Sequence, residues 1–318
     1  MTDWPNHAEA WRQWRDALGG ERMHHGWLLA GKSGLGKRDF AFAAARELVA
    51  EPGVPQPAGD HPDIITLTYG PKDDKAERAA ADGKPFELAR SIRIKQIRAM
   101  QKRLVTRPTL GSRRAIIIDP ADDMEKAAAN ALLKSLEEPP AGTFFLLVTH
   151  RPARLLPTIR SRCRTLRFPV LTESQLGTML HAAGLPSDPQ AIAAAEGSFG
   201  AAVRFAEQDL APIARVISGL LAGGDSGITG RGELARLIGQ RADRERVQAV
   251  LDLAQSLAAR AARTAEDPDR RARLIDTHAA LVNLAAEAPT ANFDPAMLPF
   301  EIGSLLVAAA PASEPAHG

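Results

Sequence analysis

The chain has 318 residues, 45% of them hydrophobic, and a formal net charge of only +2. Its length exceeds that of a usual single domain and its apolar content suffices for packed cores, so we expect several domains and exclude a disordered or fibrous protein. The apolar runs fall far short of the roughly 18 residues that span a bilayer, and the first residues lack the features of a signal peptide, so we expect a cytoplasmic protein without membrane contact.

Residues 1–169 alternate short apolar runs with helical patterns, which is typical of a parallel sheet flanked by helices. A helix is expected over 39–49, and the polar stretch 70–85, punctuated by Gly and Pro, is expected to be an exposed loop. The predicted strands are 26–30, 63–68, 115–119 and 143–149.

Beyond residue 169 the pattern is helical almost throughout. Short helices over 173–183, 189–195 and 201–207 predict a small domain over residues 170–210. Longer Ala- and Arg-rich helices follow, interrupted at Gly223-Gly224 and Ala288-Pro289, and predict a separate all-α domain over residues 211–318 with a disordered tail.

Directly after the first predicted strand, residues 31–38 read GKSGLGKR and match the phosphate-binding P-loop through its lysine. Glycines let backbone N–H groups surround phosphate oxygens, the following helix presents its positive end, and Lys37 adds a point charge. The alternative interpretation is a glycine-rich turn that binds no ligand. The predicted strand before it and the predicted helix after it favour the P-loop interpretation.

Two substitutions remove the hydrolytic parts of this motif. The Ser or Thr that would coordinate Mg²⁺ is replaced by Arg38. A strand ends in Asp119, as in the second half of such a site, but Pro120 follows where hydrolysing relatives of the additional-strand class place the Glu that polarises water. Asp122 and Asp123 lie at another offset from the strand end and are a weaker alternative for a catalytic carboxylate.

Three segments carry a family resemblance: NALLKSLEEPP over 130–140, FFLLVT over 144–149 and IRSRC over 159–163. In order and spacing they resemble the AAA+ clamp-loader subunits of bacterial DNA polymerase III, and the lost hydrolytic residues favour the delta-prime branch over gamma/tau. The resemblance implies an α/β P-loop AAA+ domain over 1–169, a small helical lid over 170–210 and an all-α collar over 211–318.

In that family the arginine of the Ser-Arg-Cys motif enters the ATP site of the neighbouring subunit, which implies that Arg162 is an arginine finger supplied in trans. A guanidinium group offers planar donors to the charge that develops on a transferring phosphoryl group. The alternative is an arginine held in a surface salt bridge. Cys163, the single cysteine, is expected to pack beside the finger, because no nearby histidine would activate a catalytic thiolate.

The resemblance also implies a degenerate nucleotide site. The sequence leaves open whether ATP or ADP still binds there, and no cofactor is required. The sensor arginine of hydrolysing relatives is replaced by Gly200, and Arg204, one turn later, stays unassigned. The zinc module of the family has gone, since residues 50–62 contain no cysteine, so we expect no zinc or other metal. The residues implied at the nucleotide site are Gly31, Gly34, Gly36, Lys37, Asp119 and Thr149.

Nine basic residues and no acidic one occur between residues 88 and 114. Within this stretch, over residues 94–104, apolar side chains share one helical face, while Lys95, Arg98 and Lys102 lie on the opposite one. Basic residues on the corresponding helix of clamp loaders follow duplex phosphates, which implies that these residues lie near DNA. A merely solvated basic face is the alternative.

These features together predict a non-hydrolysing clamp-loader subunit of the DNA polymerase III holoenzyme. It would work with gamma/tau and delta subunits to load the sliding clamp onto primed DNA. Alone it should show no ATPase activity, although it would belong to a DNA-directed DNA polymerase complex. One alternative is an active AAA+ ATPase such as gamma/tau or a branch-migration motor, against which Arg38 and Pro120 argue. A P-loop kinase for a small molecule is disfavoured by the Ser-Arg-Cys motif and the helical second half.

Overall fold

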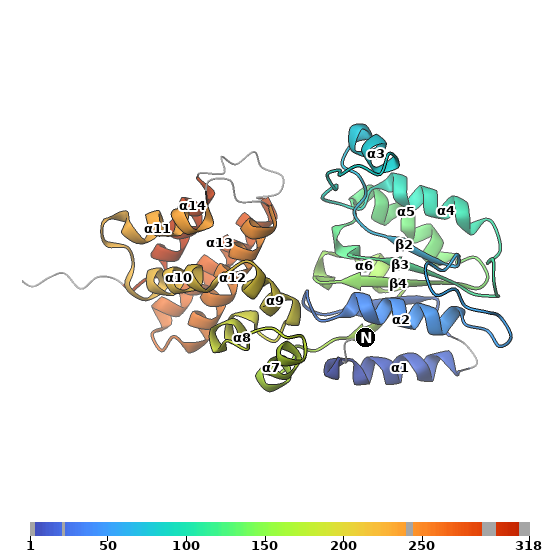
Figure 1. Cartoon of the computed structure of the whole chain (residues 1–318), viewed down its shortest axis with the longest axis horizontal. Helices are drawn as coiled ribbons and strands as arrows, with labels where there is room; N and C mark the ends of the chain where they lie inside the picture. The colour runs from blue at the N-terminus through green and yellow to red at the C-terminus, as the bar shows by residue number, and fades with distance from the viewer. Residues whose placement is uncertain (1–3, 21–22, 240–243, 288–296, 312–318) are drawn as a thin grey trace, which may run out of the picture. The chain divides into compact units, whose positions relative to one another are not determined.

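The chain folds into two compact units, Met1–Val170 and Leu171–Gly318, in a computed structural model that describes residues 4–20, 23–239, 244–287 and 297–311. The first unit is an α/β domain and the second is built of helices (Figure 1). This arrangement confirms the predicted fold class of a P-loop α/β domain followed by helical structure. None of the helices in the described ranges is long and apolar enough to cross a membrane.

The centre of the first unit is a five-stranded parallel sheet with the order β2-β3-β4-β1-β5. β1 and β3 are buried along their whole length, as expected for a parallel sheet covered on both faces. The predicted strands are confirmed, and the structure adds β5, which the sequence does not predict because only Leu166 of its residues is buried. The strands are β1 Gly26–Ala30, β2 Ile64–Leu67, β3 Arg114–Ile118, β4 Thr143–Thr149 and β5 Arg164–Arg167.

Helices cover both faces of this sheet (Figure 1). α1 and α2 pack on one face, against Trp27 and Leu29 of β1, whereas α4 and α5 pack on the other, against Leu28. Successive residues of a strand point to opposite faces, so β1 contributes to both apolar cores. The helical elements here are η1 Pro5–His7, α1 Ala8–Leu18, α2 Lys37–Val49, α3 Asp74–Ala81, α4 Ile94–Leu104, η2 Ala121–Asp123, α5 Lys126–Glu137, η3 Pro152–Arg154 and α6 Pro157–Arg160.

The prediction of an exposed loop over 70–85 is wrong in its middle, where α3 forms. Asp73 caps this helix, because its carboxylate Oδ1 accepts a hydrogen bond of 2.8 Å from the backbone N–H of Ala76. The residues that follow are mostly good helix formers, and the Gly and Pro residues lie only on either side. Ala76 is the one buried residue of α3, and alanine is the largest apolar side chain in the helix, so no run of large apolar residues signals it.

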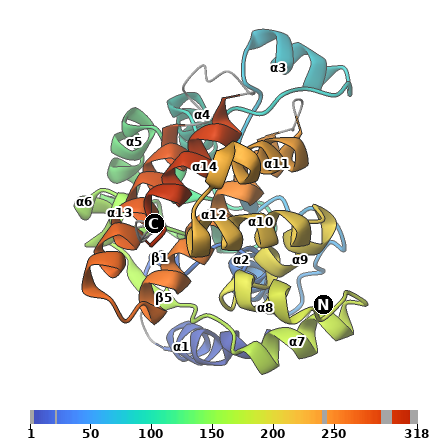
Figure 2. The same cartoon turned by 90° about the vertical axis from the view of Figure 1, so that its left-hand side faces the viewer.

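All regular elements of the second unit in the described ranges are helices, which Figure 2 shows in a view turned by 90° from that of Figure 1. Ala191 and Ala194 of α8 and Phe205 of α9 share one apolar core with residues of α10 to α14. The boundary between lid and collar at residue 210 stays a prediction. The elements are α7 Glu173–Ala182, α8 Pro189–Ala195, α9 Phe199–Glu207, α10 Ala211–Gly223, η4 Ser226–Ile228, α11 Thr229–Ile238, α12 Arg244–Thr264, α13 Pro268–Glu287 and α14 Leu298–Ala308.

Two sequence predictions concern breaks in this helical unit. α10 ends at Gly223, and Gly224 has a φ of +71°, a left-handed conformation that favours glycine, so this predicted interruption is present. The interruption at Ala288-Pro289 and the predicted disordered tail, from residue 312 onward, lie outside the described residues.

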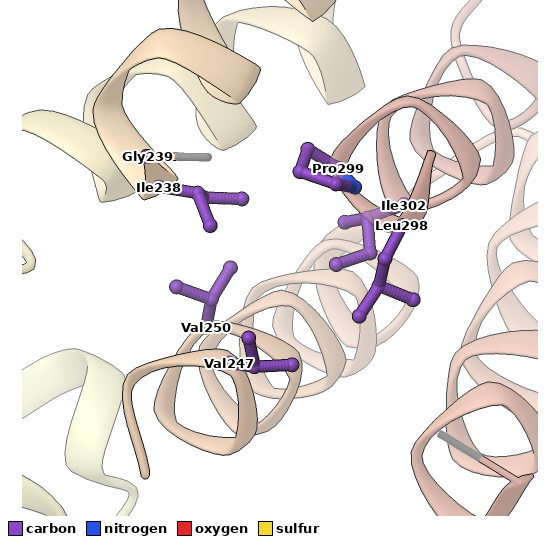
Figure 3. Close-up of a pocket in the computed structure, with 7 residues that line it drawn as sticks. All are labelled: Ile238, Gly239, Val247, Val250, Leu298, Pro299 and Ile302. Carbon is purple, nitrogen blue, oxygen red and sulfur yellow. The ribbon is translucent and has the colours of Figure 1, made fainter. Parts of the chain in front are cut away.

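A small apolar pocket of about 30 Å³ lies between α11, α12 and α14 (Figure 3). Ile238, Val250 and Pro299 point towards it from three different helices. Sites for small molecules usually measure roughly 300 Å³ or more, so this space is a packing defect rather than a ligand site. The complete lining is Ile238, Gly239, Val247, Val250, Leu298, Pro299 and Ile302.

Candidate nucleotide site, arginine finger and basic helix

The P-loop lies between β1 and α2, at the carboxyl edge of the sheet. Gly34 and Gly36 have φ values of +77° and +71°, so this loop geometry favours glycine at both positions. Asp119 follows β3, Thr149 ends β4, and the carbonyl of Thr149 accepts a hydrogen bond of 3.4 Å from the N–H of Gly31. Because β3, β4 and β1 are neighbours, the fold brings these sequence-predicted residues to one place.

Lys37 is the buried cation of this loop, with only 2% of its surface exposed. Its Nζ donates hydrogen bonds to the carbonyls of Gly31, at 2.7 Å, and of Lys32, at 2.6 Å. Burial lowers the pKa of Lys37 to about 8, although the negative charge of Asp119 acts in the opposite direction. The ammonium group is therefore bonded to the carbonyls of its own loop.

An aromatic side chain from the start of the chain covers the end of the P-loop. A Cβ atom placed on Gly36 would lie 2.2 Å from a ring carbon of Trp4, so the indole lies directly against this glycine. Trp4 stacks on His7 with ring centroids 5.2 Å apart, and the His7 ring nitrogen Nε2 lies 2.7 Å from the carbonyl oxygen of Leu35. Sequence reasoning misses this contact, since nothing near Trp4 signals a partner 32 residues away.

The residue that replaces the metal-binding hydroxyl is next to the acidic end of β3. The Nε atom of Arg38 lies 3.8 Å from Oδ2 of Asp119. Burial raises the pKa of Asp119, and the positive charges of Arg38 and Lys37 partly oppose this. A magnesium ion requires oxygen ligands, whereas the position beside Asp119 already holds a cationic side chain, so the residues present do not fit a magnesium site.

Asp122, the weaker alternative for a catalytic carboxylate, is engaged within the chain. Its Oδ1 accepts a hydrogen bond of 2.9 Å from the backbone N–H of His150, and its Oδ2 lies 3.4 Å from Nε of Arg151. Burial raises the pKa of Asp122, because it disfavours the charged carboxylate. The hydrogen bond from the backbone of His150 and further contacts with His150 and Thr149 outweigh burial, so the net effect is a lowered pKa. Both oxygens are thus held by structural contacts.

Metal ligands do not gather elsewhere in the described ranges. No group of three or more His, Cys, Asp or Glu side chains there is arranged to hold a metal ion.

Arg162 lies in the turn between α6 and β5, with 34% of its side chain exposed. Its Nη2 forms an ion pair of 2.7 Å with Oε1 of Glu137, and its Nη1 donates a hydrogen bond of 2.9 Å to the carbonyl of Thr158. The neighbouring Cys163 packs against the core under α4 and α5, and burial raises the pKa of its thiol to about 12. Such a thiol is not a nucleophile at neutral pH.

The predicted basic helix is α4, and its cations differ in their surroundings. Nζ of Lys95 lies 2.7 Å from Oε2 of Glu77 in α3, the helix that the sequence does not predict. Arg98 and Lys102 are exposed and have no ion pair or hydrogen bond within the described residues. Arg114, in contrast, is buried and donates to the carbonyls at the end of α4, which makes it a structural residue.

In the second unit, the position that replaces the sensor arginine lies in the first turn of α9. Gly200 has no side chain there, and Arg204, one turn later, lies 3.9 Å from Oδ2 of Asp252 in α12. Arg204 is therefore engaged inside its own unit.

Comparison with known proteins places the first unit in a family. The DNA polymerase III delta' subunit of Pseudomonas aeruginosa is 37% identical over 167 residues, which is 47% of this chain and 46% of that protein. The delta' subunit of Bacillus subtilis is 35% identical over 159 residues, 46% of this chain and 43% of that protein. A family model described as DNA polymerase III, delta subunit, matches residues 6–172, more than half of the chain.

The chain belongs to the DNA polymerase III delta-prime family. It spans about half the length of the curated delta-prime relatives that it matches. The tau subunit of Escherichia coli is also similar, with 31% identity over 199 residues, 60% of this chain and 30% of tau. A solved gamma subunit-related protein of Thermotoga maritima aligns with 94% of this chain and 98% of its own, at a TM-score of 0.46 and 18% identity.

Proposed function

We propose that this delta-prime family member is the static subunit of a bacterial clamp loader. It associates with gamma/tau and delta subunits and helps to load the sliding clamp onto primed DNA, without hydrolysing ATP at its own P-loop. The observation that carries this proposal is the pair formed by Arg38 and Asp119, in which a side-chain cation stands where hydrolysis needs a metal ion.

Four further features support an inactive P-loop. Pro120 offers no acid or base to a water molecule, and both oxygens of Asp122 are held by Arg151 and the backbone of His150. The ammonium group of Lys37 is bonded to the loop itself, while Trp4 lies against Gly36. The chain accordingly needs no ATP or ADP for its own structure.

We propose that Arg162 acts in the ATP site of the neighbouring subunit. Its planar donors suit the charge on a phosphoryl group in transfer, and arginine fingers contribute about 10³ to 10⁵ in rate. The side chain is partly exposed on a short turn, which leaves it accessible to a neighbour.

The first experiment measures ATP hydrolysis. The purified chain should show negligible turnover, and a rate near one per second at saturating ATP would overturn the inactive site. In a complex reconstituted with gamma/tau and delta, Arg162→Ala should reduce ATP hydrolysis at the adjacent subunit by about 10³-fold while assembly is unchanged. Arg160→Ala is the matched control, because this exposed arginine is the last residue of α6, two positions before Arg162. Equal ATPase in the Arg162→Ala and Arg160→Ala complexes would remove the finger assignment.

We also propose that Arg98 and Lys102 contact the phosphate backbone of duplex DNA within the complex. Their charges are not neutralised by a neighbour, so they can displace counterions from phosphates. Arg98→Ala and Lys102→Ala should weaken DNA binding uniformly across sequences and each reduce the salt slope by about 1. Lys95→Ala serves as the comparison, since Glu77 already neutralises that ammonium. If all three variants bind DNA like the unmodified complex, the basic face is only solvated.

A further inference from the structure

The contacts of Arg162 come from two different elements. Glu137 is the last residue of α5, and Thr158 lies in α6. One holds Nη2 through an ion pair of 2.7 Å, and the other holds Nη1 through a hydrogen bond of 2.9 Å. A guanidinium group that is contacted at both Nη atoms is restrained in its orientation, so these contacts set its preferred direction.

The same contacts leave donors free. Each Nη atom carries a second hydrogen, and Nε carries one that has no acceptor within the described residues. A planar group whose direction is set and whose remaining N–H bonds are unsatisfied is prepared for an anionic acceptor outside the chain. Preorganised donors of this kind accelerate a reaction because they need no reordering when charge develops.

The ion pair has an opposing effect, since a carboxylate reduces the positive charge that Arg162 presents. That effect is small here, because 48% of the Glu137 side chain is exposed and water screens its charge. The same screening limits the strength of the ion pair, so Glu137 orients the guanidinium together with the hydrogen bond to Thr158 and not by itself. We expect the orienting contact to matter more than the loss of charge, and the Glu137→Ala variant tests this.

We propose that Glu137 is a positioning residue for the arginine finger: it directs the guanidinium of Arg162 towards the phosphoryl group bound by the neighbouring subunit. The inference rests on the proposed function of Arg162. Glu137 itself contacts neither nucleotide nor reacting atoms. Its removal should therefore lower kcat of the neighbour's ATPase and leave KM for ATP unchanged, since the residues that bind ATP belong to the other subunit.

The test uses the reconstituted complex with full-length chains. Glu137→Ala should lower kcat about tenfold, a part of the finger's effect, because a misdirected guanidinium still visits the productive geometry. Glu137→Gln keeps an acceptor oxygen at the same reach and should retain most of kcat, whereas Glu137→Lys repels the arginine and should give the lowest value. Glu138→Ala is the matched control, an adjacent exposed carboxylate without a contact to Arg162 in the described structure.

A double variant separates the two proposals. Combined with Arg162→Ala, Glu137→Ala should have no further effect, because no arginine is left to position. If Arg162→Ala lowers ATPase but Glu137→Ala leaves kcat unchanged or raises it, the positioning role is wrong and the finger stands. If Arg162→Ala has no effect, the finger itself is wrong. Gel filtration of each complex checks assembly, and the ranking of Gln, Ala and Lys variants must hold among those that assemble.

Discussion

Replacing Lys37 with methionine tests how much the buried ammonium group lowers the free energy of unfolding of the first unit. Burial lowers the pKa of this lysine from 10.5 to about 8, and the difference of about 2.5 units corresponds to roughly 3 kcal/mol at neutral pH. Methionine has a similar length and can keep the packing of the stem. The change also removes the hydrogen bonds that Lys37 donates to the carbonyls of Gly31 and Lys32. Lys32 is exposed, so water can donate to its carbonyl in place of the Lys37 ammonium group.

The expected result is a first unit that is more stable by about 1 to 3 kcal/mol, since the lost desolvation penalty exceeds the lost hydrogen bonds. The pH dependence gives an independent check. Between pH 8 and 10.5 the unfolded chain binds a proton at Lys37 that the folded chain does not, so stability rises with pH across this window. The Lys37→Met variant should lack this rise.

The assay is urea unfolding followed by tryptophan fluorescence. All four tryptophans, at positions 4, 11, 14 and 27, lie in the first unit, so the signal reports that unit alone. Lys32→Met is the control, an exposed lysine of the same loop, and should change stability by less than about 0.5 kcal/mol. A Lys37→Met variant less stable than the unmodified chain would refute the reasoning, because the ammonium–carbonyl bonds would then outweigh desolvation.

Three further predictions concern stability. Burial and the charge of Lys37 lower the pKa of His150 from 6.5 to about 4. Between these pH values the unfolded chain binds a proton at His150 that the folded chain does not, so the first unit should lose stability as pH falls. In fluorescence-monitored unfolding, the free energy of unfolding of His150→Gln should depend less on pH across this range. Asp63→Ala should lower the free energy of unfolding by about 3 kcal/mol in the same assay, because the buried carboxylate accepts hydrogen bonds of 2.6 and 2.8 Å from the N–H groups of Thr109 and Leu110. A decrease of less than about 0.5 kcal/mol would contradict this. Val250→Ile adds one methylene group towards the pocket of Figure 3 and should raise the free energy of unfolding of the second unit by about 0.8 kcal/mol. Unfolding followed by far-ultraviolet circular dichroism measures this change. A decrease would show that the helices cannot accommodate the added methylene group.

The sequence by itself determined the elements that carry strong periodic signals. β1 and β4 have the predicted bounds, and α4 begins and ends where its apolar face predicts. These elements could be predicted because burial imposes a regular spacing on apolar residues within one segment. The P-loop and its substitution at Arg38 were equally readable, because they are local patterns of residue type.

Only the tertiary structure decided which of these residues meet. β5 is an edge strand with one buried residue, and α3 buries a single alanine, so neither carries the run of large apolar side chains that marks the other elements. The contacts of Trp4 with Gly36 and of Arg162 with Glu137 join residues far apart in the chain. A sequence specifies residue types and their spacing along the chain, but distances across the fold depend on how the sheet aligns its loops. Whether a given cation is free, paired or buried follows from that alignment.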